Sequence, residues 1–270
     1  MNHLLIIDPQ NDFCDIAGAA LPVAGANADM QRLSRLIQRH RDNIDGITVT
    51  LDSHASVAVE RTTFWQTAQG DAVAPFTFIT AADVRARTYC PRDPTLTPAV
   101  LAMLAQLASQ GRPGLVVWPV HCVTGTWGHN IHIELAEQLQ AWEYARQRTV
   151  RKVLKGEYPL SEHFGVFEAD APVLGVASTQ FNTALATALT TGVDLLLLTG
   201  QASSHCVAAS FDQLAGYLTK NQGPQPRIVV LRDCMSPVTG FESASQAFFE
   251  RAQAFGAELM TASEASALLA

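Results

Sequence analysis

Short apolar runs alternate with amphipathic stretches from one end of the chain to the other. Each run is brief, rich in Leu, Ile or Val, and bounded by polar or turn-forming residues, which is typical of buried strands. The predicted strands are 3–8, 45–52, 114–120, 149–154, 194–200 and 227–233, and 255–261 can add a short last one. Near-continuous apolar runs of this kind favour parallel strands that are covered on both faces.

Between these runs, apolar residues recur at helical spacing. The predicted helices lie near 27–41, 97–110, 131–147, 179–191, 204–219 and 241–255. Strands that alternate with helices predict an α/β fold: a Rossmann-like three-layer αβα sandwich around a central, mostly parallel six-stranded sheet. Residues 60–95 lack clear periodicity, so we expect a long loop excursion above the sheet, a kind of segment that is often functional. No Gly/Ser linker divides the chain, which predicts a single domain over 1–270.

Composition narrows the class of protein. The 270 residues are 48% apolar and 16% charged, which suits a buried core, and the formal net charge is −7. Without clustered Lys and Arg we expect no nucleic-acid partner. No apolar run approaches the roughly 20 residues of a membrane span, so we expect no membrane partner either. The start "MNHLLIID" lacks the charged region of a signal peptide, and the 5 cysteines form no C-x-x-C pair. These features predict a cytoplasmic protein with reduced thiols.

Polar, chemically active residues follow the predicted strands. In open α/β sheets, ligands bind at the carboxyl ends of the strands. Five of these ends supply such groups in chain order: Asp8, Asp52 with His54, His121, Lys155, and the stretch "GQASSHCV" at 200–207. Such a set is difficult to explain as scaffold, and it predicts an active site at this edge of the sheet.

Asp52 and His54 are two residues apart in an extended segment, so their side chains point the same way. His121 at a neighbouring strand end can join them. One carboxylate and two imidazoles with open positions are typical of a catalytic metal site. The alternative is that each histidine is a hydrogen-bonding residue at a strand end.

Asp8 and Lys155 each have an ordinary alternative as well. Asp8 in "IIDPQNDF" can cap a turn around Pro9, as Asp12 can further on, although Asp8 ends its strand directly. Lys155 in "LKGEY" can be a solvated surface lysine. The residues alone leave these readings open.

Cys206 falls in the first turn of a helix that we expect to begin near Ser204, with Ser203 or Ser204 as its cap. The helix dipole and the free N–H groups there favour a thiolate. The alternative is a small buried apolar residue. Because adjacent helical residues point about 100° apart, we expect His205 to face away from Cys206 and not to act as its base.

Together these motifs resemble the isochorismatase-like cysteine hydrolases, and within them the nicotinamidases. The resemblance is carried by "LLIIDPQNDFC", "TLDSH", "WPVHCVTGTWG", "KGEYPLSEHFGVF" and "GQASSHCV", in this order, with the weaker "LRDCMSPV" near the C-terminus. It spans most of the chain. Individual motifs are short, but the ordered set is specific.

The resemblance implies a role for each group of residues. Asp8, Lys155 and Cys206 would be the catalytic triad, and the oxyanion donors beside a cis peptide would be the backbone N–H groups of Ala202 and Cys206. Phe13, Trp118 and Phe164 would contact the substrate, and Asp52, His54 and His121 would hold a divalent metal, zinc first, with manganese or iron as alternatives.

The sequence departs from the nicotinamidase pattern at several positions. The loop "DSHASVAVE" lacks a further histidine that many nicotinamidases carry, and Glu60 can take its place as a ligand. Ser204 stands where an acid is expected, and Phe164 where a tyrosine is frequent. The chain therefore resembles a large, divergent member of the family.

The resemblance implies a thiol-dependent amidohydrolase that converts nicotinamide, or a similar heteroaromatic carboxamide, to the acid and ammonia through a cysteinyl thioester. The alternative within the same fold is hydrolysis of another small amide, ureide or carbamoyl compound. An iron oxygenase would leave Asp8, Lys155 and Cys206 without a role, and a non-catalytic binding protein would not need them intact. We expect a small-molecule amide as the partner, and the sequence leaves a homo-oligomer open.

Overall fold

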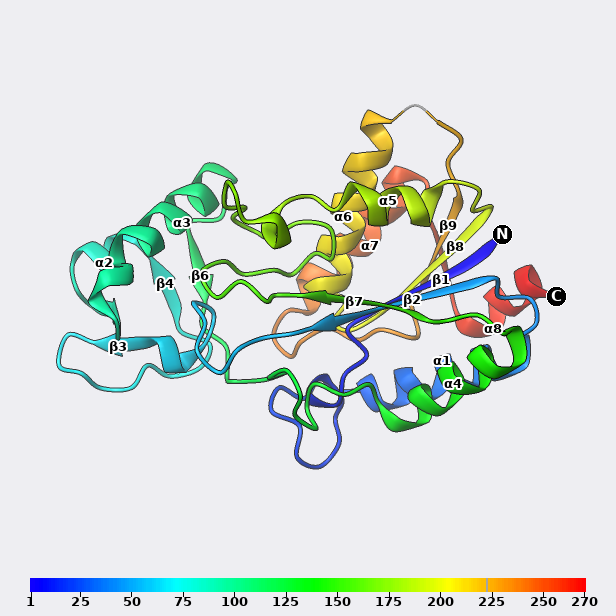
Figure 1. The fold of residues 1–270 in the computed structure, drawn as a ribbon, viewed down its shortest axis with the longest axis horizontal. Coiled ribbons are helices and arrows are strands. Elements are labelled where there is room, and N and C mark those ends of the chain that lie inside the picture. The colour runs from blue at the N-terminus through cyan, green and yellow to red at the C-terminus, as the bar shows by residue number, and fades with distance from the viewer. Residues whose placement is uncertain (222) are drawn as a thin grey trace.

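The computed structural model describes residues 1–221 and 223–270, and a six-stranded sheet forms its centre (Figure 1). The strand order is β10-β9-β8-β1-β2-β7, and every pairing is parallel. The strands are β1 (Asn2–Ile7), β2 (Gly46–Asp52), β7 (Arg151–Lys155), β8 (Leu195–Gly200), β9 (Arg227–Leu231) and β10 (Glu258–Met260). The predicted α/β class and parallel sheet are confirmed.

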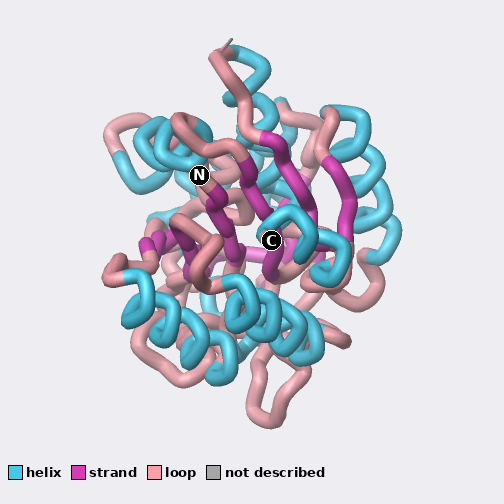
Figure 2. Tube along the Cα trace, turned by 90° about the vertical axis from the view of Figure 1, so that its right-hand side faces the viewer, coloured by secondary structure: helices cyan, strands magenta, loops and turns pink. Residues whose placement is uncertain are grey.

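Helices cover both faces of this sheet, as Figure 2 shows. The helices on one face are α1 (Ala26–His40), α4 (Ile133–Arg146) and the short α8 (Ala262–Ala265), and those on the other are α5 (Thr183–Thr190), α6 (Cys206–Lys220) and α7 (Glu242–Phe255). Alternate residues of β1 face opposite layers, since Leu4 and Ile6 pack with the first group and Leu5 and Ile7 with the second. The predicted three-layer αβα sandwich is therefore confirmed, and each of these helices except α8 overlaps a predicted range.

One predicted strand does not join the central sheet. Of residues 114–120, only β6 (Gly114–Val116) is a strand, and it pairs antiparallel with β4 (Phe78–Thr80). On the side of β2 away from β1, the neighbouring strand is β7. The sixth strand of the sheet is β10, at the opposite edge. An apolar run alone cannot distinguish these two locations.

Residues 60–95 are not a plain loop. They contain β3 (Trp65–Thr67), β4, α2 (Ala81–Arg85) and β5 (Tyr89–Pro91), and α3 (Thr97–Ser109) follows them. Trp65, Ile79, Leu104 and other apolar residues form a separate core there. Figure 1 shows this part, which includes α2, lying together with α3 beyond the end of the central sheet.

The described residues also contain five 3-10 helices: Asn11–Phe13, Thr62–Phe64, Pro94–Leu96, Ala177–Thr179 and Ser266–Leu269. In the described part of the chain, no helix has both the length and the apolar character that crossing a bilayer requires.

Candidate active site

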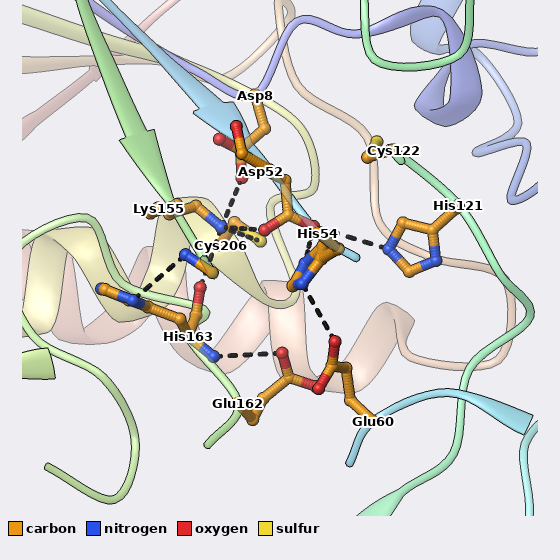
Figure 3. A network of polar contacts seen from close by, with 12 residues as sticks. Asp8, Asp52, His54, Glu60, His121, Cys122, Lys155, Glu162, His163 and Cys206 are labelled. Atoms are coloured by element: carbon orange, nitrogen blue, oxygen red, sulfur yellow. Dashed lines mark hydrogen bonds and ion pairs between the residues drawn. The ribbon is translucent and has the colours of Figure 1, made fainter. Parts of the chain in front are cut away.

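The topology of the sheet brings the predicted site residues to one place. The neighbouring strands β8, β1, β2 and β7 run parallel, so their carboxyl ends meet at the same edge. Asp8 follows β1, Asp52 ends β2, Lys155 ends β7, and Cys206 lies shortly after β8. Figure 3 shows their side chains converging on Lys155.

Lys155 is the centre of this group. Its ammonium nitrogen lies 2.9 Å from Asp8 Oδ2, 2.8 Å from Asp52 Oδ1 and 3.6 Å from Cys206 Sγ. It also donates a hydrogen bond to the backbone carbonyl of His163 at 2.9 Å. Burial disfavours its charge, but Asp52 and Asp8 outweigh burial and raise the pKa of Lys155 well above its usual value. Lys155 is therefore a buried cation shared by two carboxylates and the thiol, not a solvated surface lysine.

Asp8 and Cys206 are both buried beside this cation. Burial raises the pKa of Asp8, and Lys155 opposes that effect. Burial also raises the pKa of the Cys206 thiol well above its usual value, again against Lys155. Lys155 thus favours the ionised forms, as expected, but burial outweighs it. A thiol in this environment needs a base, and Asp8, which contacts the same Lys155 ammonium, is the carboxylate in position to supply one.

The start of α6 differs from the prediction. The helix begins at Cys206, and its N-cap is His205, which makes no side-chain capping hydrogen bond. Ser204 Oγ accepts a hydrogen bond from the Val238 N–H at 3.0 Å, and Ser203 Oγ accepts one from the Ser245 hydroxyl at 2.7 Å. The predicted serine cap is wrong because both hydroxyls bind segments near the C-terminus instead.

The backbone around Ala202 provides free donors. The peptide bond between Gln201 and Ala202 is cis, as the resemblance implies. Within residues 1–221 and 223–270, neither the Ala202 N–H nor the Cys206 N–H donates a hydrogen bond to a protein group. Two N–H groups at the thiol are therefore free to bind a substrate oxygen.

A second cluster lies on the other side of Asp52. One ligand atom each from Asp52, His54 and His121 lies within 4.8 Å of the others, and all three residues are buried. Asp52 Oδ2 is 2.7 Å from His54 Nε2 and 3.5 Å from His121 Nε2. Four atoms that each bind one zinc ion at about 2.1 Å are about 3.4 Å apart in a tetrahedron, so this spacing is close to what a metal requires.

The outer ring nitrogens of both histidines lie close to oxygen atoms of the protein. His54 Nδ1 lies 2.9 Å from Glu60 Oε1, and His121 Nδ1 lies 2.8 Å from the carbonyl of Pro119. Metal-binding histidines ordinarily have such partners, which fix the ring and leave Nε2 for the ion. The donor set therefore fits a metal ion. Glu60 contacts the outer nitrogen of His54 and is not one of the three residues whose ligand atoms lie together.

Charges around the cluster act on the two imidazoles in opposite directions. Burial lowers the pKa of His54, but Asp52 and Glu60 outweigh burial and raise this pKa to about 9. Burial and the neighbouring Arg61 lower the pKa of His121 to about 4. Arg61 is fully buried, contacts the His121 ring, and lies 3.2 Å from Glu60 Oε1. Nothing in the sequence around Arg61 distinguishes it from a surface arginine, so the prediction missed it.

A cavity of about 390 Å³, its mouth included, joins the thiol to this cluster. The three aromatic residues that the resemblance assigns to substrate contact, Phe13, Trp118 and Phe164, all line it. The other lining residues are Leu21, Asp52, His121, Glu162, Ala202, His205, Cys206 and Val238. His205 is therefore on the cavity wall rather than facing elsewhere, because it precedes the helix and does not follow helical geometry. Glu162 is a wall residue that the sequence prediction did not single out.

The chain is thus a three-layer α/β protein with a buried thiol site, and it shares its fold with nicotinamidases, pyrazinamidases and isochorismatase-family proteins. The yeast nicotinamidase Pnc1p matches 96% of this chain and 99% of its own at 20% identity, with a TM-score of 0.65. A Pyrococcus horikoshii pyrazinamidase in complex with zinc matches 96% and 98% at 20% identity, with a TM-score of 0.54.

An isochorismatase family protein from Desulfovibrio vulgaris matches 99% of this chain and 97% of its own at 17% identity, with a TM-score of 0.52. The yeast nicotinamidase is also known bound to the inhibitor nicotinaldehyde. No protein-family model and no curated protein sequence matches the chain.

Proposed function

We propose that this chain is a thiol-dependent amidohydrolase that hydrolyses nicotinamide, or a similar heteroaromatic carboxamide, to the acid and ammonia. One observation carries this proposal. The Lys155 ammonium lies 2.9 Å from Asp8 Oδ2 and 3.6 Å from Cys206 Sγ, and Cys206 lines the cavity. This grouping supports Asp8 as the base, Lys155 as the cation and Cys206 as the nucleophile. The fold shared with nicotinamidases and pyrazinamidases supports it.

In the first half of the reaction, Asp8 takes the proton of the Cys206 thiol as the sulfur attacks the amide carbon. A C–S bond forms, and the carbonyl oxygen becomes an oxyanion that the Ala202 and Cys206 N–H groups stabilise. Asp8 then gives its proton to the leaving nitrogen, the C–N bond breaks and ammonia departs. Lys155 lowers the cost of negative charge on Asp8 and on the sulfur, against the effect of burial.

In the second half, water hydrolyses the thioester. Asp8 takes a proton from the water, whose oxygen attacks the same carbon through a second oxyanion at the same N–H groups. The C–S bond breaks, the acid product leaves, and the proton on Asp8 returns to the sulfur of Cys206. The site is then in its starting state.

The cavity walls suit a single flat ring. Phe13 lies on one part of the wall, and Trp118 and Phe164 meet edge-to-face on another, with ring centroids 6.3 Å apart. Asp52, His54 and His121 would hold the divalent metal, zinc first, which when bound supplies a Lewis acid for a ring nitrogen. When the aromatic wall and the metal site together hold the ring, the carboxamide on that ring is positioned next to the sulfur.

Coupled detection of ammonia tests this proposal. Purified protein is incubated with nicotinamide, pyrazinamide and simple ureides, with and without a chelator, beside the Cys206→Ala variant. We expect ammonia from at least one heteroaromatic amide, loss of the activity on chelation, and none from Cys206→Ala. If the metal-loaded protein leaves every amide intact, the proposal fails, and release from ureides alone favours the alternative substrate class.

A further inference from the structure

Glu162 is a buried carboxyl group on the wall of the active-site cavity. Its side chain is only 6% exposed, and it lines the cavity together with Cys206 and Phe164. It follows β7 in the segment that also carries His163, the residue whose carbonyl binds Lys155. Figure 3 shows its carboxyl group beside that of Glu60, below His54.

The protein satisfies this carboxyl group only in part. Glu162 Oε1 accepts a hydrogen bond from the His163 N–H at 3.1 Å. Throughout residues 1–221 and 223–270, no Lys, Arg or His forms an ion pair with it, and Oε2 has no hydrogen-bond partner. The cation whose charge acts on Glu162 is His54, and His54 is already paired with Asp52 and Glu60. Burial, with the charge of Glu60, raises the pKa of Glu162 to about 8.

The free oxygen of such a carboxyl group needs hydrogen bonds from water, and a ligand that displaces the water from the cavity has to replace them. Most of the other polar groups of this wall have roles or partners, whereas the indole N–H of Trp118 has no hydrogen-bond partner among the described residues. Ala202 and Cys206 face the carboxamide in the proposed reaction, and Asp52 and His121 belong to the metal-binding cluster. His205 has Ser204 Oγ 2.8 Å from its Nδ1. Apart from the nitrogen assigned to the metal, the ring of an unsubstituted pyridine carboxamide has no polar group for Glu162.

We propose that Glu162 is a specificity-determining residue that binds a hydroxyl or amino substituent on the substrate ring. The preferred substrates are then heteroaromatic carboxamides that carry such a substituent, rather than nicotinamide itself. A hydroxyl can donate a hydrogen bond to the ionised carboxyl group and accept one from the neutral acid, so either state of Glu162 can bind it. This inference rests on the proposed amidase function.

The test compares matched pairs of nicotinamides that carry either a hydroxyl or a methyl group at the same ring position, and likewise amino against methyl. We expect kcat/KM for the polar member of at least one pair to exceed that for the methyl member by about 10- to 100-fold, the usual effect of one hydrogen bond to a carboxyl group. Glu162→Leu brings this ratio near one, and Glu162→Gln, which keeps hydrogen-bonding atoms, retains part of it. Glu157→Gln, an exposed neighbour off this cavity, keeps the full ratio.

A ratio that is equal in wild type and Glu162→Leu, with both proteins folded by circular dichroism, overturns the inference. Binding to the Cys206→Ala variant, followed by the fluorescence of Trp118 in the cavity wall, gives a readout that needs no catalysis. If no amide is hydrolysed but Cys206→Ala still prefers the polar ring compounds through Glu162, the amidase proposal fails and the role of Glu162 stands. If hydrolysis occurs without any such preference, the reverse holds.

Discussion

Asp52 and Lys155 are paired across the neighbouring parallel strands β2 and β7, and their side chains meet with Oδ1 and Nζ 2.8 Å apart. The other oxygen of Asp52 lies 2.7 Å from His54 Nε2. One carboxylate therefore contacts both the cation beside the thiol and the cluster that can hold a metal. The two halves of the site depend on a single side chain.

Replacing Asp52 should disturb both halves. Asp52→Asn removes a charge from a buried network, which costs about 3 kcal/mol of unfolding free energy, and it removes a ligand atom from the metal cluster. Urea unfolding of the metal-free protein measures the first effect, and a metal-competition titration measures the second. Asp45→Asn is the control, because the Asp45–Arg146 pair is partly exposed and should cost less than about 1 kcal/mol. Equal free energies of unfolding for the two variants would contradict the claim that Asp52 stabilises a buried charge network.

Glu60 should act on the metal through His54. Its carboxylate lies 2.9 Å from His54 Nδ1, so Glu60→Gln should weaken metal binding by about 10- to 100-fold, as loss of an outer partner does elsewhere. The apparent dissociation constant, measured with a chromophoric chelator, checks this. Glu157→Gln serves as the surface control. An unchanged constant in Glu60→Gln would show that this contact does not orient the imidazole.

Cys206 should be the one cysteine that the reaction requires. Cys206→Ser should lower kcat/KM by at least about 10³-fold, because the nucleophile, base and oxyanion donors act as a unit. Cys90→Ser, a half-buried cysteine outside the cavity, should retain full activity. Steady-state ammonia release from both variants makes the comparison. Substantial activity in Cys206→Ser would require another nucleophile.

Two histidines that the fold holds neutral, the buried His163 and the partly buried His205, should make the fold sensitive to acid. Burial, with Lys155 nearby, lowers the pKa of His163 to about 3, and burial lowers that of His205 to about 4. In the unfolded chain each histidine takes up a proton near pH 6.5. The stability that each neutral histidine contributes to the fold is therefore fully present above that pH, and it is lost as the pH falls toward the pKa of the folded state. Between pH 7 and pH 5, each histidine should lower the free energy of unfolding by about 2 kcal/mol.

Urea unfolding of metal-free protein at pH 7 and pH 5 measures this loss. In His205→Phe, which keeps an aromatic ring against Trp118 and Phe241, the loss of stability should be about 2 kcal/mol smaller than in wild type. Identical losses in the two proteins would mean that His205 is not held neutral by the fold.

The sequence predicts most of the fold because its strands and helices have distinct periods. The alternation of apolar runs and helical patterns is enough to predict the three-layer sandwich. Because the carboxyl ends of parallel strands meet at one edge, it is also enough to predict that Asp8, Asp52 and Lys155 lie together. The error at residues 114–120 has a different origin. Periodicity marks a strand but not its neighbour, and β6 pairs with β4 in a separate small sheet.

Predictions from local sequence are wrong where contacts with distant parts of the chain determine the partners or the burial of a side chain. Ser203 and Ser204 are residues of a type that commonly caps helices. Their hydroxyls instead accept hydrogen bonds from Ser245 and Val238, which lie far along the chain. Glu162 is similarly invisible in the sequence, because a glutamate in a loop is normally solvated and only the folded chain buries it in the cavity wall.

The central claim is that Cys206 attacks a carbonyl carbon attached to a ring in this cavity, and an aldehyde probe tests it most directly. The sulfur adds to nicotinaldehyde to give a thiohemiacetal, with a new C–S bond and the thiol proton transferred to oxygen. With the carbonyl carbon labelled with ¹³C, we predict that its NMR signal moves from the aldehyde to the thiohemiacetal region with wild type and stays unchanged with Cys206→Ala. An aldehyde signal that is unchanged by folded wild-type protein, or an adduct that also forms with Cys206→Ala, would contradict the claim.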